Sequence, residues 1–149
     1  MYKMAFNEQL GTGSDPAQIS PLNLAFVGDA VYSLLTRQYI VTDATRPTGE
    51  LNKRSSAHVC ATKQSKDYYK LLEHLTDKEL AIIKRGRNAS PSQKAKNASV
   101  VDYRNATGLE ALFGYLYLKG ENKRILELFD ICWNEDEKNG EKTIPTKNN

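Results

Sequence analysis

The chain has 149 residues, of which 40% are hydrophobic and 26% charged, and its formal net charge is +3. This length allows one domain with a hydrophobic core and is too short for two. No apolar run approaches the roughly 20 residues that a membrane span needs. The start of the chain carries Glu8 where a secretion signal requires an apolar core, so we expect no export.

The two cysteines, Cys60 and Cys132, lie far apart in the sequence. In a chain without a secretion signal, such cysteines are expected to be reduced, buried and structural. His58 and His74 are the only histidines, and these four residues do not have the spacing of zinc ligands.

Helical patterns account for most of the chain, and no alternating run rich in Val, Ile and Thr indicates a strand. Ser20 and Pro21 are typical of a helix start. Thr76 and Glu79 have the spacing of a capping box, and Gly120 marks a helix end. The predicted helices span residues 20 to about 40, 48 to about 62, 65 to 75, 76 to about 87, 100 to 119 and 122 to 133.

These patterns predict an all-α fold with one domain. We expect residues 1–19 to form a poorly ordered lead and residues 134–149 to form a polar tail. The domain itself should occupy residues 20–133.

The first predicted helix has apolar side chains pointing in nearly every direction, so it should be buried on most sides. Gly28 lies in its interior, where glycine costs about 1 kcal/mol relative to alanine. A glycine there indicates the close approach of another backbone or helix. A domain this small can surround such a helix only partly, so we expect the surface around Phe26 to contact a partner. A two-fold interface would bury that surface.

Two acidic residues interrupt apolar helical runs. Asp29 lies within residues 22–32, and Glu110 lies within residues 107–117. A buried carboxylate is costly unless it is paired, protonated or bound to a metal. Each acid could pair with an arginine or lysine of another helix, or the two acids could meet at a divalent-cation site. We favour the second interpretation, because Mg²⁺ takes one or two carboxylates, keeps several waters and binds phosphate oxygens.

Positive charge is concentrated in residues 84–104, which contain six basic residues and one acid, a net charge of +5. The remainder of the chain therefore carries −2. A basic stretch on a slightly acidic body indicates contact with a polyanion, and a solvated loop has the same composition. The forked side chains of Arg85 and Arg87 suit phosphate contact, or they could flank a helix C-cap at Gly86. The candidate contacts are Lys84, Arg85, Arg87, Asn88, Lys94, Lys96 and Arg104.

Both acidic motifs resemble the ribonuclease III family. Residues 24–31, Leu-Ala-Phe-Val-Gly-Asp-Ala-Val, resemble its signature helix, which reads Glu-Phe-Leu-Gly-Asp-Ser-Val. Residues 109–117, Leu-Glu-Ala-Leu-Phe-Gly-Tyr-Leu-Tyr, resemble its second acidic helix, Glu-Ala-Leu-Ile-Gly-Ala-Ile-Tyr. Residues 85–89 and 103–111, with Lys94, resemble more closely the Mini-ribonuclease III subfamily, bacterial enzymes that consist of the catalytic domain alone. The resemblance covers roughly residues 21–129.

The resemblance implies a ribonuclease III-type helical domain that forms a homodimer and cuts double-stranded RNA with Mg²⁺, for which Mn²⁺ can substitute. The products would carry 5′-phosphate and 3′-hydroxyl ends. Asp29 and Glu110 carry over as catalytic metal ligands, Phe26 as a dimer-interface residue, and the basic residues above as RNA contacts. The subfamily's substrate, the precursor of 23S ribosomal RNA, implies the bacterial cytoplasm.

The chain also departs from the wider family, which has a glutamate where Ala25 and Leu22 stand and an aspartate where Thr107 stands. With fewer protein ligands, the metal should be held by more waters and RNA phosphates. Glu50 matches an acidic family position and is a further candidate ligand.

Two other functions fit parts of the sequence. A non-catalytic helical RNA-binding or ribosome-assembly protein would share the basic stretch but would not need the acids. A helix-turn-helix DNA-binding protein would need a recognition helix with exposed Asn, Gln or Arg in its first turn, and no predicted helix has one.

Overall fold

The computed structural model describes residues 15–89 and 99–140, with side chains up to residue 134. Six α-helices and two short 3₁₀ helices make up this part of the chain, which contains no strand, so the all-α prediction is confirmed. In chain order they are η1 (Pro16–Gln18), α2 (Pro21–Asp43), α3 (Thr48–Val59), α4 (Ala61–Leu71), η2 (Leu72–His74), α5 (Asp77–Ala89), α6 (Val100–Leu118) and α7 (Asn122–Gly140). None of the described helices is long and apolar enough to cross a membrane.

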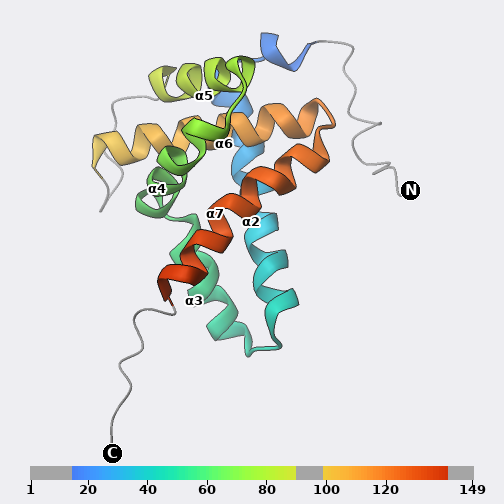
Figure 1. The fold of residues 1–149 in the computed structure, drawn as a ribbon, viewed down its shortest axis with the longest axis vertical. Coiled ribbons are helices and arrows are strands. Elements are labelled where there is room, and N and C mark those ends of the chain that lie inside the picture. The colour runs from blue at the N-terminus through green and yellow to red at the C-terminus, as the bar shows by residue number, and fades with distance from the viewer. Residues whose placement is uncertain (1–14, 90–98, 141–149) are drawn as a thin grey trace, which may run out of the picture.

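Helix α6 is the centre of the domain. Helices α2, α4, α5 and α7 pack around it, while α3 lies at the far end of the molecule from α5 (Figure 1). From Asn105 to Leu116 every residue of α6 is buried except Glu110, which is half-buried. The aromatic rings of Tyr32 from α2 and Phe129 from α7 meet Phe113 edge-on in the core. Glu110 is therefore the one acid within the buried stretch of α6.

Helix α2 is buried on one side only. Leu24, Tyr32 and Leu35 belong to the core, whereas Phe26 is 83% exposed and Leu34 is 64% exposed. This confirms the expectation that part of the apolar surface of this helix remains uncovered within one chain. Val41 continues the exposed stripe toward the end of α2.

Several helix ends follow their local signals. The Thr76–Glu79 capping box forms in both directions, with backbone N–H groups donating at 2.9 and 3.2 Å. Gly120 has a φ of 80° and ends α6 as predicted. Pro21 occupies the first turn of α2, but the Ser20 side chain makes no capping hydrogen bond, contrary to the prediction. Cys132 is buried as expected, whereas Cys60 is exposed, contrary to the prediction, and neither forms a disulfide.

Other boundaries differ from the sequence-based ones. Helix α5 continues to Ala89, and α7 continues to Gly140, because no strong stop signal follows either predicted end. Residues 15–19, assigned to the lead, form η1 and pack against α6. Residues 1–14 and 141–149 lie outside the described residues.

Candidate active site

Two glycines allow α2 and α6 to cross at very short range. A Cβ atom built on Gly28 would lie 1.6 Å from the Glu110 carbonyl oxygen, and one built on Gly114 would lie 1.9 Å from the Leu24 carbonyl oxygen. Only glycine fits at either position, which confirms the close approach predicted from Gly28. Asp29 is adjacent to one of these glycines, and Glu110 lies one turn before the other, so the crossing brings the two acids together.

The two carboxyl groups differ in exposure. Asp29 is exposed, so the prediction that it is buried was wrong: the apolar neighbours that suggested burial belong partly to the uncovered stripe of α2. Glu110 is half-buried. Burial is the largest cause that raises the pKa of Glu110, the negative charge of Asp29 also raises it, and the Gln64 side chain lowers it, so that the pKa lies at about 8. Neither acid forms an ion pair with a described residue, so the alternative of two structural ion pairs is not observed there.

A divalent cation would relieve the repulsion between these acids. Among the described residues, no group of three or more His, Cys, Asp and Glu side chains could hold a metal ion. Asp29 and Glu110 could contribute two carboxylates, a number that would fit Mg²⁺ held largely by water and phosphate oxygens. Ala25 is buried and offers no donor, and the Thr107 hydroxyl donates to the Tyr103 carbonyl oxygen at 3.0 Å.

A fully buried carboxylate does occur, at Asp67 on α4, and the sequence analysis missed it. It accepts hydrogen bonds from the Tyr32 hydroxyl and, at 2.5 Å, from Lys63 Nζ. Lys70 Nζ lies 3.8 Å away. The two lysines precede and follow Asp67 by four and three residues, a spacing typical of helical ion pairs that could have identified it. Its ion pairs with both lysines lie within α4, and the hydrogen bond from Tyr32 joins α4 to α2.

Gln64 is a second buried polar residue that the sequence did not reveal. Its side chain is 2% exposed, and its Nε2 atom has no hydrogen-bond partner among the described residues. It stands in a polar stretch of α4, yet the helical spacing places it on one stripe with Tyr68 and Leu71. That stripe packs against α6, where Gln64 lies beside Glu110.

The predicted polyanion contacts occupy different environments. Lys84, Arg85 and Asn88 are exposed on the last turns of α5, which is helical here, and Arg85 donates to the Ala17 carbonyl oxygen at 3.0 Å. Arg104 is half-buried, and its Nε atom has no partner among the described residues. Lys94 and Lys96 lie outside the described residues.

Arg87 is held inside the fold. Its Nε donates to the Oδ1 atom of buried Asn105 at 2.9 Å, and Asn105 Nδ2 donates to Ser65 Oγ at 3.0 Å. This chain of hydrogen bonds ties α5, α6 and α4 together. Gly86 is not a helix stop, as a C-cap would require: a Cβ there would lie 2.6 Å from Ala111 Cβ, so it is a second close crossing with α6.

Glu50 lies apart from the acid pair within one chain. It forms surface ion pairs with Arg46 at 3.5 Å and Arg54 at 3.2 Å, beside the end of α2. Asp29 is in the middle of that helix, roughly 20 Å back along its axis. The prediction of Glu50 as a ligand to the same ion is not supported by this placement.

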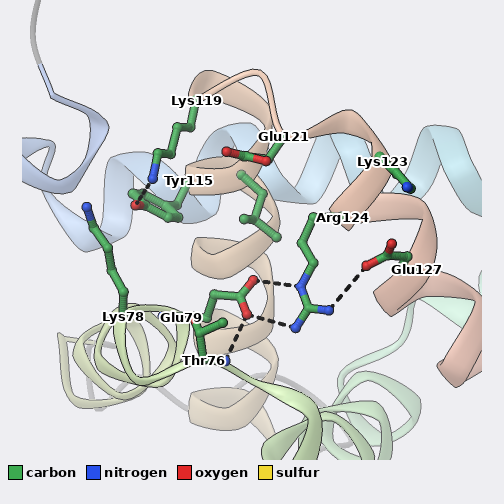
Figure 2. A pocket seen from close by; sticks show the side chains of 10 residues that line it. Thr76, Lys78, Glu79, Tyr115, Lys119, Glu121, Lys123, Arg124 and Glu127 are labelled. Atoms are coloured by element: carbon green, nitrogen blue, oxygen red, sulfur yellow. Dashed lines mark hydrogen bonds and ion pairs between the residues drawn. The ribbon is translucent and has the colours of Figure 1, made fainter.

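A cavity of about 390 Å³ lies between the start of α5, the end of α6 and the start of α7 (Figure 2). Arg124 donates to both carboxylate oxygens of Glu79, at 3.0 and 2.9 Å, and to Glu127 at 3.3 Å. Burial is the largest single cause acting on the pKa of Glu79 and raises it, but the hydrogen bonds from Arg124 and Thr76, together with the charge of Arg124, outweigh it and leave the pKa below its usual value. The charges of this wall neutralise one another and join α5 to α7, and neither Asp29 nor Glu110 lines the cavity.

An acid pair at a glycine-mediated helix crossing in an all-α domain is the arrangement expected of the ribonuclease III class. The family model described as the ribonuclease III domain matches residues 22–121, and the chain belongs to this family of endoribonucleases. Within the family it is similar to Mini-ribonuclease 3 of Brevibacillus brevis, with 43% identity over 114 residues that cover 76% of this chain and 85% of the relative.

Two further relatives support this assignment. Mini-ribonuclease 3 of Clostridium tetani is 40% identical over 124 residues, which cover 83% of this chain and 82% of the relative. A crystal structure of a Fusobacterium nucleatum protein superimposes with a TM-score of 0.74 at 32% identity, covering 83% of this chain and 98% of that one. The resemblance to the catalytic-domain-only subfamily is thereby confirmed.

Proposed function

We propose that this protein is a Mg²⁺-dependent endoribonuclease that cleaves double-stranded RNA and that Asp29 and Glu110 hold the metal. The observation that carries the proposal is the placement of two carboxylates, neither paired with a cation of the described residues, at the α2–α6 crossing. A pure RNA-binding protein gains nothing from a pair of acids whose charges repel each other and would repel phosphates.

The two acids have different tasks in this proposal. Asp29 is exposed and meets the ion from the solvent side, where RNA phosphates approach, while Glu110 meets it from the protein side. Mg²⁺, when bound, supplies positive charge that stabilises an in-line displacement at phosphorus. Both carboxylates are needed for this, because ligands in this site otherwise come from water and RNA.

We further propose a homodimer that forms through the exposed apolar stripe of α2, with Phe26 near its centre. Leu22, Leu34 and Val41 extend the stripe, and a two-fold axis would bury it against the same residues of a second copy. Asp29 follows Phe26 by less than one turn, so the two centres of a dimer would lie near the interface. Each centre would then cut one strand of a duplex and leave 5′-phosphate and 3′-hydroxyl ends.

The proposed substrate is the precursor of 23S ribosomal RNA in the bacterial cytoplasm, which follows from the subfamily resemblance. Lys84, Arg85 and Asn88 on the exposed turns of α5 are proposed to contact its phosphates. A-form RNA is recognised through shape and backbone, so exposed cations can replace base-specific contacts.

The test is cleavage of a labelled duplex with and without Mg²⁺, by the wild type and by Asp29→Asn. The substitution removes a charge from an exposed position, so cleavage should disappear while folding and metal-free duplex binding are retained. Glu110→Gln should behave alike, and the double variant should be little worse than either, because the two acids act as a unit. Glu73→Gln, an exposed acid of η2, is the matched control and should cleave normally. Turnover by Asp29→Asn, or cleavage without a divalent cation, would leave the non-catalytic RNA-binding protein as the better description.

A further inference from the structure

The buried amide of Gln64 is a feature that the fold alone does not explain. Its side chain is 2% exposed, and its Nε2 atom has no hydrogen-bond partner among the described residues. Buried polar groups in native proteins are nearly always hydrogen-bonded, and an unpaired one opposes folding. An apolar side chain of the same size would pack at this position without that cost, so the amide requires another reason.

The surroundings of Gln64 supply that reason. Helix α4 packs against α6, and the amide lies beside the Glu110 carboxyl group. The next residue, Ser65, accepts a hydrogen bond from Asn105 of α6 and fixes α4 at this level of the crossing. Gln64 therefore lies on the side of α4 that faces α6, beside a site acid.

Within the described part of the chain, two acids are available to this site, so the orientation of each one matters. Groups that hydrogen-bond to metal ligands fix their geometry, and their loss commonly weakens metal binding by about 10- to 100-fold. The described residues around Glu110 offer no cation for that role, and the Thr107 hydroxyl is directed to the Tyr103 carbonyl oxygen.

We propose that Gln64 is a positioning residue of the metal site, whose buried amide donates to the Glu110 carboxylate and holds it toward Asp29. This inference rests on the proposed function, because it takes Asp29 and Glu110 as the ligands.

The test measures Mn²⁺ binding by the free-ion electron paramagnetic resonance signal, with no RNA present. Gln64→Met keeps the length and volume of the side chain and removes the amide. It should weaken Mn²⁺ binding about 10- to 100-fold and leave the melting temperature of the metal-free protein equal or higher. Gln64→Glu keeps the shape of the side chain and replaces the donor by a carboxylate, so it should not restore the wild-type Mn²⁺ affinity. Combined with Glu110→Gln, it should bind Mn²⁺ no better than Glu110→Gln alone.

Ser65→Ala is the matched structural control. It removes the hydrogen bond to Asn105 from the neighbouring position, so it should lower the melting temperature while Mn²⁺ affinity stays within about twofold of the wild type, a difference well below that expected for Gln64→Met. Wild-type affinity in Gln64→Met, or an equal loss of affinity in Ser65→Ala, would overturn the inference. Failure of the wild type itself to bind Mn²⁺ is a different result, since it would refute the proposed metal site and the inference with it.

Discussion

Helices α2 and α6 have similar apolar sequences but differ in what surrounds them. Helix α6 is covered on all sides by α2, α4, α5 and α7 (Figure 1). Helix α2 packs one side against α6 and leaves Phe26, Leu34 and Val41 exposed. Sequence alone makes the two equivalent, because both lack a polar face. The difference arises because a domain of this size can surround one such helix and not two.

The same contrast divides the site. Asp29 belongs to the partly uncovered helix and is exposed, whereas Glu110 belongs to the central helix and is half-buried. One acid is therefore open to RNA and the other is controlled by the protein interior. In the proposed function, the uncovered helix would provide access and a surface for a second copy, and the covered helix would provide a fixed position. Substitutions at three places test this difference between α2 and α6: the contact between the two helices at Gly28 (the seam), the exposed apolar stripe of α2, and the two acids.

The largest effect is expected at the seam between the two helices. Gly28→Ala places a methyl group 1.6 Å from the Glu110 carbonyl oxygen, a backbone atom that cannot move without separating α2 from α6. We expect a loss of about 3 kcal/mol or more in the free energy of unfolding, measured by urea denaturation. Gly49→Ala in α3 is the control, because no atom lies within 4 Å of its added Cβ. It should gain about 0.5–1 kcal/mol. A wild-type midpoint for Gly28→Ala would show that the helices do not cross this closely.

The sequence predicted the seam and the helix ends because their signals are local. Gly28 stood out within an apolar helix, Thr76 and Glu79 had capping spacing, and Gly120 had the stop position. The environments of Gln64 and Asp67 depend on partners far away in the chain, such as Tyr32 and Glu110, and a polar stretch gives little indication of them. Burial is set by neighbours that a single helix does not reveal.

The exposure of Asp29 was mispredicted for the same reason. Its apolar neighbours were taken as evidence of a core, but part of them form the stripe of α2 that one chain leaves uncovered. Gly86 was likewise compatible with a helix end, and only the approach of α6 identifies it as a crossing. Periodicity shows which residues share a face, and tertiary contacts decide whether that face is covered.

The next largest effect is expected on the stripe. Phe26→Glu puts a charge on the exposed apolar surface, so the domain should fold normally and remain monomeric, with strongly reduced duplex cleavage. Sedimentation equilibrium at micromolar concentration measures this directly. Tyr69→Glu changes an exposed aromatic residue of α4 and should remain dimeric. A monomeric wild type at that concentration would contradict the proposal of two centres acting on one duplex.

A smaller effect concerns the pH dependence of stability in the presence of a chelator. The pKa of Glu110 is raised from 4.5 to about 8 in the fold. Between these values the folded protein keeps a proton that the unfolded chain has lost, so stability falls as pH rises and levels off above pH 8. Glu110→Gln should remove this fall, measured as melting temperature against pH.

Asp29→Asn separates the two causes of that shift. Burial is the larger cause and the charge of Asp29 the smaller one, so this variant should keep most of the pH dependence. Parallel curves for Glu110→Gln and the wild type would mean that Glu110 is ionised in the metal-free protein. A curve for Asp29→Asn that matches Glu110→Gln would instead make charge repulsion the main cause.

The smallest effects are expected on α5, where the contrast between a covered and an uncovered side chain recurs in two arginines. Arg85→Ala removes an exposed cation and should weaken metal-free duplex binding, with the slope of log affinity against log salt reduced by about 1. Arg87→Ala leaves the buried Asn105 Oδ1 atom without its donor and should cost about 1–3 kcal/mol of stability. It should change the salt slope less, because its side chain already has a partner inside the fold.

Filter binding at several salt concentrations, together with urea denaturation, distinguishes the effects of the two arginine substitutions. An unchanged slope for Arg85→Ala would place the RNA elsewhere, and an unchanged stability for Arg87→Ala would make it the RNA contact instead.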